Sequence, residues 1–136
     1  LNKVDYFVSK RRENHQYLYD LFKKDLEAYF ILPEKTENSN PSWFGFMLTL
    51  RENKKIQRDK LLIYLEENKI GTRLFFGGNM TKQPAYKHIN KKIHCNLENS
   101  DFVMNNSFWI GVWPGLEKQH LEYMYLTIKK YILNNV

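Results

Sequence analysis

Apolar residues recur at helical spacing near both ends of the chain. Residues 3–30 show this spacing in two groups, which the polar stretch 11–14 separates. A helix with two separate apolar groups can contact two surfaces, so we expect it to lie between this domain and a neighbouring one. The last helix has the most regular period, with apolar positions three and four residues apart at Leu121, Met124, Tyr125, Ile128 and Ile132.

Three other segments have the apolar and aromatic content of β-strands. Residues 43–50 carry bulky side chains at both alternating sets of positions, so we expect both faces of this strand to be covered. A second strand runs from Thr72 to about Phe76, and a third covers residues 108–113. The tryptophans near or within these strands are expected in the core or in an interdomain contact: Trp43, Trp109 and Trp113.

Two shorter helices are indicated between the strands. Residues 57–70 carry apolar side chains near one stripe, and Gly71 supplies the left-handed residue expected at the end of such a helix. Residues 101–106 predict a short helical turn that is capped by Ser100 or Asp101.

Together these elements predict an α+β fold, in which a three-stranded antiparallel or mixed sheet has its helices mostly on one face. With 136 residues, of which 43% are hydrophobic and 15% aromatic, the chain can bury the core of one domain but is short for two. We therefore expect one small domain over residues 1–136, with residues 1–30 as an interdomain helix. The chain begins with Leu1 and enters a helical pattern at once, as a fragment of a larger protein would.

Signals for export and for disulfide bonding are not seen in the sequence. No apolar run approaches the length needed to cross a bilayer, and no charged and then apolar leader precedes a cleavage site. The single cysteine, Cys95, cannot form an internal disulfide or a cysteine-based metal site within the chain. We expect a cytoplasmic protein.

The net charge of +6 raises the question of nucleic-acid binding, because clustered Lys and Arg release counterions from phosphates. The basic residues fall in short groups along the chain, however, and several groups adjoin Glu or Asp. This distribution favours solvated helix faces over a continuous binding stripe.

No catalytic constellation is found among the residues. His15, His88, His94 and His120 lack the spacing of metal ligands. The neighbours His94 and Cys95 would point to opposite sides of an extended segment, so we interpret them as structural. We predict no catalytic residue and no metal ligand in the chain.

The segment 71–86 carries the best candidate site. Arg73 shares a strand face with Phe75, and its guanidinium could bind a carboxylate or phosphate beside aromatic rings, or could simply pair with a nearby Glu. The glycine pair 77–78 permits positive backbone dihedral angles and close approach of a ligand, although a plain tight turn needs the same residues. Asn79 and Gln83 could bind sugar hydroxyls or could be hydrated loop residues. The combination of groups suits a polar, anionic small molecule.

Several blocks of the sequence are similar to the carboxy-terminal domain of the DegT/DnrJ family of sugar-nucleotide aminotransferases. The blocks are PSWFGF at 41–46, LEENKIGTRLFFGGNMTKQP at 65–84, NSD at 99–101, MN at 104–105 and FWIGVWPGL at 108–116. Within the family, the chain most resembles the branch of 3-dehydrases that act on CDP-4-dehydro-6-deoxyglucose in the dideoxysugar pathways of lipopolysaccharide biosynthesis.

The resemblance implies a small domain of an aspartate-aminotransferase-fold enzyme that uses pyridoxal or pyridoxamine phosphate (PLP or PMP) and works as a homodimer. In the dehydrase branch, a histidine replaces the usual lysine, the 3-hydroxyl leaves, and an iron–sulfur cluster, of two irons and two sulfurs, passes electrons from a reductase partner. The family's large domain holds the cofactor, the catalytic histidine and the cluster cysteines. The resemblance thus implies that this chain alone binds no cofactor and is inactive.

The resemblance also implies a role for the segment 71–84, which would line the sugar-nucleotide side of the active site. Arg73, Asn79 and Gln83 would make its polar contacts, with Phe75 or Phe76 as a wall. Cys95 lies in a segment that departs from the family pattern, and Glu117 stands where relatives tend to have a hydroxyl residue capping the last helix; Glu still suits that helix end. Two alternatives stay open: an aminotransferase of the same family, and a free-standing basic module that binds nucleic acid or an acidic partner.

Overall fold

Four strands form one antiparallel sheet in the order β1–β2–β4–β3, in a computed structural model that describes residues 2–52 and 55–136. The strands are β1 (Phe30–Ile31), β2 (Gly45–Leu50), β3 (Thr72–Leu74) and β4 (Ser107–Gly111). The prediction of three strands was therefore wrong by one. The strand that it missed, β1, has only two residues, which is too short to show an alternating pattern.

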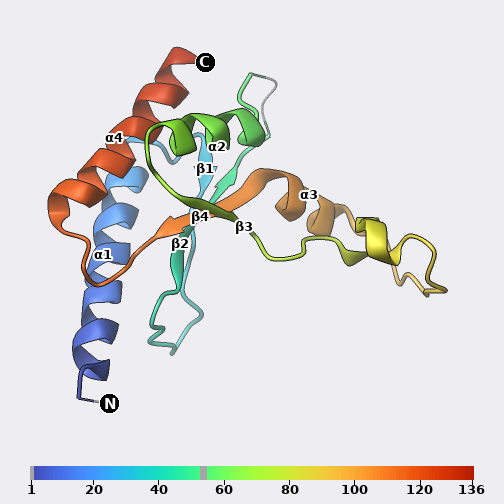
Figure 1. The fold of residues 1–136 in the computed structure, drawn as a ribbon, viewed down its shortest axis with the longest axis horizontal. Helices are drawn as coiled ribbons and strands as arrows, with labels where there is room; N and C mark the ends of the chain where they lie inside the picture. The colour runs from blue at the N-terminus through green and yellow to red at the C-terminus, as the bar shows by residue number, and fades with distance from the viewer. Residues whose placement is uncertain (1, 53–54) are drawn as a thin grey trace.

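Three helices supply the core on one side of the sheet: α1 (Val4–Asp25), α2 (Arg58–Glu67) and α4 (Lys118–Asn134). α1 and α4 pack side by side (Figure 1). A fourth helix, α3 (Glu98–Asn106), lies at the right in Figure 1, away from α1 and α4. Beside it a segment projects as an arm that contains two short 3-10 helices, η1 (Met80–Lys82) and η2 (Pro84–Tyr86). This arrangement confirms the α+β class and the placement of most helices on one face.

Phe22 of α1 lies at the centre of the core. Its ring centroid is 5.8 Å from that of Phe30, 5.3 Å from that of Phe46 and 5.6 Å from that of Tyr125. These contacts join α1, β1, β2 and α4 around one fully buried side chain. Aromatic rings in tilted and edge-to-face arrangements at this spacing are favourable beyond their buried area.

The two apolar groups of the first helix have different surroundings. Leu18 and Phe22 are fully buried in the core, whereas Val4, Tyr6 and Phe7 are about half exposed. The helix also ends at Asp25 and not near residue 30, because the chain turns there and enters β1. A contact between the amino-terminal group and a neighbouring domain remains a prediction.

The polar stretch of α1 binds backbone carbonyls of two distant segments. Arg11 donates to the carbonyls of Trp43 and Phe44, at 3.0 Å and 3.2 Å. Asn14 is buried and donates to the carbonyl of Trp113 at 2.9 Å. α1 therefore fixes the chain just before β2 and just after β4, at the end of the sheet where Gly45 pairs with Gly111.

One predicted helix end differs from the structure and another agrees with it. α2 ends through Lys69, which has a φ of 62° and whose following amide, that of Ile70, donates to the carbonyl of Leu65. The left-handed stop is therefore Lys69, and the assignment to Gly71 was wrong. The expectation that Glu117 suits the start of the last helix is confirmed. Glu117 is the N-cap of α4 and forms a reciprocal capping box with His120.

α3 begins three residues before Asp101, at Glu98, and its N-cap Leu97 makes no side-chain cap bond. The predicted cap by Ser100 or Asp101 was wrong, because the Asp101 carboxylate bonds to a different segment of the chain.

Among the described residues, no helix has both the length and the apolar character to span a bilayer.

Candidate functional site

An aromatic cluster covers part of the sheet face that the core helices leave open. Met47, Trp109 and Arg73 are paired across β2, β4 and β3, on the face opposite to the buried Phe46 and Ile110. Around Trp109 lie three phenylalanine rings, with centroids at 5.1 Å, 5.6 Å and 5.0 Å: Phe44, Phe75 and Phe76. We call Trp109 and these three residues the aromatic cluster.

The aromatic cluster is unusually exposed for its size. Phe44 is 71% exposed and Phe76 is 75% exposed, although both rings contact Trp109. Grouped aromatic rings at the surface indicate a ligand-binding or interaction site. The expectation that both faces of the 43–50 strand are covered was therefore wrong at Phe44, which precedes β2 and projects onto the open face.

Arg73 lies at the edge of the aromatic cluster with its charge unpaired. Its Nη1 donates to the carbonyl of Thr72 at 2.8 Å, and within residues 2–52 and 55–136 no carboxylate forms an ion pair with it. The nearby Glu66 instead accepts from the backbone and hydroxyl of Thr72, at 3.0 Å and 3.2 Å. The described structure thus disfavours the alternative of an Arg73–Glu pair and leaves the exposed guanidinium able to bind an anion.

The turn after β3 holds a phenylalanine in an unfavourable backbone conformation. Phe76 has a φ of 47°, and its amide donates to the carbonyl of Leu74 at 2.8 Å. A bulky residue in the left-handed region is rare, and such strain is concentrated at functional sites. This turn brings the rings of both Phe75 and Phe76 against Trp109.

Gly78 is required by packing within the chain. Its φ is 58°, and an added Cβ would lie 2.6 Å from Cγ of Met104 on α3. The glycine pair therefore closes a tight turn that contacts α3, which is the second of the two interpretations that the sequence left open.

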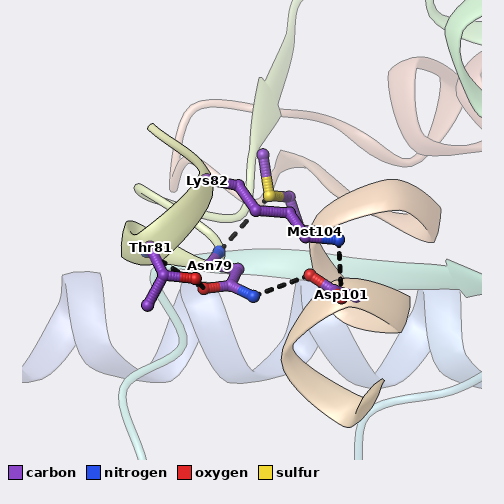
Figure 2. A network of polar contacts seen from close by, with 5 residues as sticks. All are labelled: Asn79, Thr81, Lys82, Asp101 and Met104. Carbon is purple, nitrogen blue, oxygen red and sulfur yellow. Dashed lines mark hydrogen bonds and ion pairs between the residues drawn. The ribbon is translucent and has the colours of Figure 1, made fainter. Parts of the chain in front are cut away.

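Asn79 fixes the start of the arm to α3, as Figure 2 shows. It is 4% exposed; its Nδ2 donates to Asp101 at 2.7 Å, and its Oδ1 accepts from the amide and hydroxyl of Thr81 at 3.1 Å and 2.7 Å. Lys82 pairs with the other oxygen of Asp101 at 2.7 Å, and these bonds, that from Lys82 first, lower the pKa of Asp101. Both polar atoms of the Asn79 carboxamide thus form hydrogen bonds within the chain. The sequence had suggested a polar contact with a ligand instead.

Gln83 also bonds within the loop, because its Nε2 donates to the carbonyl of Gly77 at 2.6 Å. Asn79 and Gln83 therefore hold the loop that follows Phe76. Direct contact of either side chain with a ligand stays a prediction, as it does for Arg73, Phe75 and Phe76.

Replacing Asn79 by alanine is expected to loosen the arm more than the core. The change removes three side-chain hydrogen bonds at a buried position, and we expect a loss of about 1 kcal/mol in the free energy of unfolding. Hydrogen exchange should accelerate at the amides of residues 79–83, while the amides of β2 and β4 stay protected. The exposed Asn90→Ala is the control, and equal exchange in both variants would contradict this role for Asn79.

The aromatic cluster does not by itself enclose a ligand. The pocket next to the aromatic cluster has a volume of about 100 Å³ and is lined by Phe75, Phe76, Gly78 and Met104, among others, which is small for a sugar nucleotide. Within the described ranges no group of three His, Cys, Asp or Glu side chains could hold a metal ion, and Cys95 is exposed. A binding site that uses the aromatic cluster needs a second wall from elsewhere.

Residues 1–129 match the DegT/DnrJ/EryC1/StrS aminotransferase family. The chain belongs to this family. It is 43% identical over 127 residues to the lipopolysaccharide biosynthesis protein RfbH of Salmonella typhimurium, and 38% identical over 134 residues to a dTDP-4-dehydro-2,6-dideoxy-D-glucose 3-dehydratase of Saccharopolyspora spinosa. These matches cover 91% and 97% of this chain but only 28% of each relative.

Solved structures of the family have the same fold over this region. The GDP-4-keto-6-deoxy-D-mannose-3-dehydratase of Escherichia coli, with bound hydrated PLP, is 26% identical and superposes with a TM-score of 0.81 over 94% of this chain and 32% of its own. A putative sugar aminotransferase of Streptococcus pneumoniae, in its PMP form and 14% identical, shows the same fold with a TM-score of 0.82, over all of this chain and 33% of its own. The chain thus corresponds to about a third of these family members.

Two members of the aromatic cluster were not among the predicted site residues. Trp109 was expected in the core or in an interdomain contact, and Phe44 was expected on a covered strand face. Trp109 occupies the position opposite Met47 and Arg73, which only the strand register reveals. Trp113, by contrast, is 63% exposed, so it lies outside the core, and an interdomain contact remains a prediction for it.

Proposed function

We propose that this chain is the small carboxy-terminal domain of a larger PLP- or PMP-dependent enzyme that acts on a sugar nucleotide. The more specific proposal is a 3-dehydrase of CDP-4-keto-6-deoxyglucose in dideoxysugar and lipopolysaccharide biosynthesis, working as a homodimer in the cytoplasm. The observation that supports it is the identity of 43% and 38% to a lipopolysaccharide biosynthesis protein and to a sugar-nucleotide 3-dehydratase, over more than nine-tenths of the chain.

In this proposal the open sheet face closes over the substrate. Arg73 binds a negatively charged group of the sugar nucleotide, since its guanidinium is exposed and carries no carboxylate partner among the described residues. Phe75 and Phe76, with Phe44 and Trp109 behind them, form an apolar wall that excludes water from the sugar. Asn79 and Gln83 hold the loop that presents this wall.

The described residues do not form a binding site for PLP or PMP. No described lysine is buried, and the two that are partly buried, Lys10 and Lys129, have pKa values raised by hydrogen bonds to Glu13 and Asp25. A lysine that binds PLP needs a lowered pKa. In the dehydrase branch a histidine takes the place of this lysine, and the one buried histidine among the described residues, His15, is stacked on Trp43 in place of facing a cofactor site. We therefore assign PLP or PMP, the iron–sulfur cluster of the proposed dehydrase and the contact with a reductase partner to the rest of the enzyme, and we expect this chain alone to be inactive.

The test is to incubate the complete enzyme with CDP-4-keto-6-deoxyglucose and a reductant that supplies the two electrons of the deoxygenation, with and without an amino donor. Loss of the 3-hydroxyl as water, without incorporation of nitrogen, is the expected result. Transfer of an amino group to the sugar would instead identify an aminotransferase of the same family. Absence of both reactions with CDP-, GDP- and dTDP-linked sugars would refute the proposed function.

A further inference from the structure

The net charge of the chain is concentrated in one segment. Residues 68–97 contain six Lys and Arg and no Asp or Glu, which equals the net charge of +6 of the whole chain. The remaining residues are therefore balanced between acids and bases. Elsewhere in the chain several short basic groups adjoin Glu or Asp, which argued against a continuous charged surface. Residues 68–97 differ, because no acidic residue lies among their basic ones.

Most of this segment forms an arm that projects from the body of the domain (Figure 1). We call residues 80–97 the cationic arm. Its start is fixed to α3 by Asn79 and by the ion pair between Lys82 and Asp101. Within the arm, Lys91 donates to the carbonyls of Thr81 and Tyr86, at 3.3 Å and 2.8 Å, and so folds the far part of the arm back onto its start.

Two ammonium groups of the arm are left without a partner. Lys82 is neutralised by Asp101, and Lys91 is bonded to carbonyls. Lys87 and Lys92 are exposed, and within the described part of the chain neither side chain forms an ion pair or a hydrogen bond. Apolar side chains that are 41–53% exposed accompany them on the arm: Met80, Tyr86, Ile89 and Ile93.

We propose that the cationic arm binds the diphosphate of a nucleoside diphosphate sugar, with Lys87 and Lys92 as its charge partners. The proposal rests on the proposed function. A diphosphate diester carries one negative charge on each phosphate, which two ammonium groups can match. Proteins that bind nucleic acid by charge use several more phosphate contacts, on the order of six to ten, and the arm does not offer that number. The exposed Tyr86 ring gives the adjoining nucleobase a surface on which to stack.

The diphosphate is also the part that the substrates of the relatives share. The relatives are named for GDP-linked and dTDP-linked sugars, which differ in base and in sugar. A point-charge site made of lysines recognises phosphate without selecting the base. The arm would therefore contribute affinity to any nucleoside diphosphate in addition to Arg73, the cation at the open sheet face, while the aromatic cluster contacts the sugar.

The test compares Lys87→Gln/Lys92→Gln with the control Lys60→Gln/Lys130→Gln, which removes the same charge from exposed helix positions. Isothermal titration of the complete protein with CDP, GDP, dTDP and inorganic pyrophosphate gives the dissociation constants. We expect the arm variant to bind all four about fivefold more weakly, and to lose part of the salt dependence of binding. The control should bind as the wild type does, and circular dichroism should be unchanged in both.

Each other outcome has a defined meaning. Equal affinities in the arm variant and the control overturn the arm proposal, and leave the proposed function standing if the enzyme still turns over. An enzyme that neither dehydrates nor transaminates, yet binds nucleoside diphosphates through Lys87 and Lys92, refutes the proposed function alone. Tighter binding of single-stranded RNA than of CDP, lost in the arm variant, overturns the arm proposal in favour of a nucleic-acid module.

Discussion

Replacing Arg73 by alanine in the complete enzyme is expected to raise the KM for the sugar nucleotide at least tenfold. Tenfold corresponds to about 1.4 kcal/mol of binding free energy, which is modest for the loss of a charge-assisted hydrogen bond to an anion. The guanidinium is exposed at the edge of the aromatic cluster, so its removal leaves the core of the domain unchanged. Steady-state kinetics at saturating cofactor measure the effect.

Two companion variants separate the binding role of Arg73 from a structural one. Arg73→Lys keeps the charge but loses the planar fork of donors, so we expect a KM between those of the wild type and Arg73→Ala. Leu74→Ala changes the next residue of β3, whose side chain is on the opposite face of the strand, and should leave KM within about twofold. Unchanged kinetics in Arg73→Ala would show that the open face is not the substrate site.

The fold could be predicted from the sequence where an element is long and its period is clear. The spacing from Leu121 to Ile132 describes α4, and all five of its predicted apolar positions are buried. β1 could not be predicted, because two residues have no period and their pairing with β2 depends on a contact some 20 residues away. The end of α2 was misplaced because glycine is the usual left-handed residue, whereas here Lys69 adopts that conformation.

The sequence was enough to locate the segment of the candidate site, but not to tell which of its side chains bond within the chain. Arg73 and Phe75 lie on or beside the open face, as their alternation in the expected strand indicated. Alternation would place Phe76 on the other face; it reaches Trp109 because β3 ends at Leu74, short of the expected end near Phe76, and the chain turns there. From the sequence, Asn79 could either contact a ligand or support the loop. The structure shows its side chain donating to Asp101, which is 22 residues away and was expected to cap a helix. The charge of the arm could have been recognised by counting acids as well as bases over residues 68–97.

His15 is expected to make the domain unstable in mild acid. Its ring is 4% exposed, stacks on Trp43 with centroids 3.9 Å apart and planes 5° apart, and meets the edge of Phe46 at 5.0 Å. Within the described residues its Nε2 has no hydrogen-bond partner. Burial lowers the pKa of His15 from 6.5 to about 4, because the charged ring would lose its hydration without gaining a partner.

The sign of the effect follows from this lowered pKa. Above about pH 6.5 the imidazole is neutral in both the folded and the unfolded chain, so it does not affect stability. Between about pH 6.5 and 4 the unfolded chain takes up a proton that the folded chain does not, so stability falls as the pH falls. Over this range of about 2.5 pH units the loss reaches about 3 kcal/mol, which is a large part of the stability of a small domain.

Denaturant unfolding at several pH values, followed by tryptophan fluorescence, tests this expectation against His15→Phe. Phenylalanine keeps a flat ring against Trp43 and removes the titrating group, so the variant should lose about 3 kcal/mol less than the wild type between pH 6.5 and 4. The exposed carboxylates titrate in both proteins and cancel in this difference, as does the pair of Asp25 with Lys129. The exposed His88→Phe is the control and should follow the wild type. If His15→Phe loses stability in parallel with the wild type, His15 is protonated in the folded chain, and its ring must then reach a partner or water by leaving Trp43.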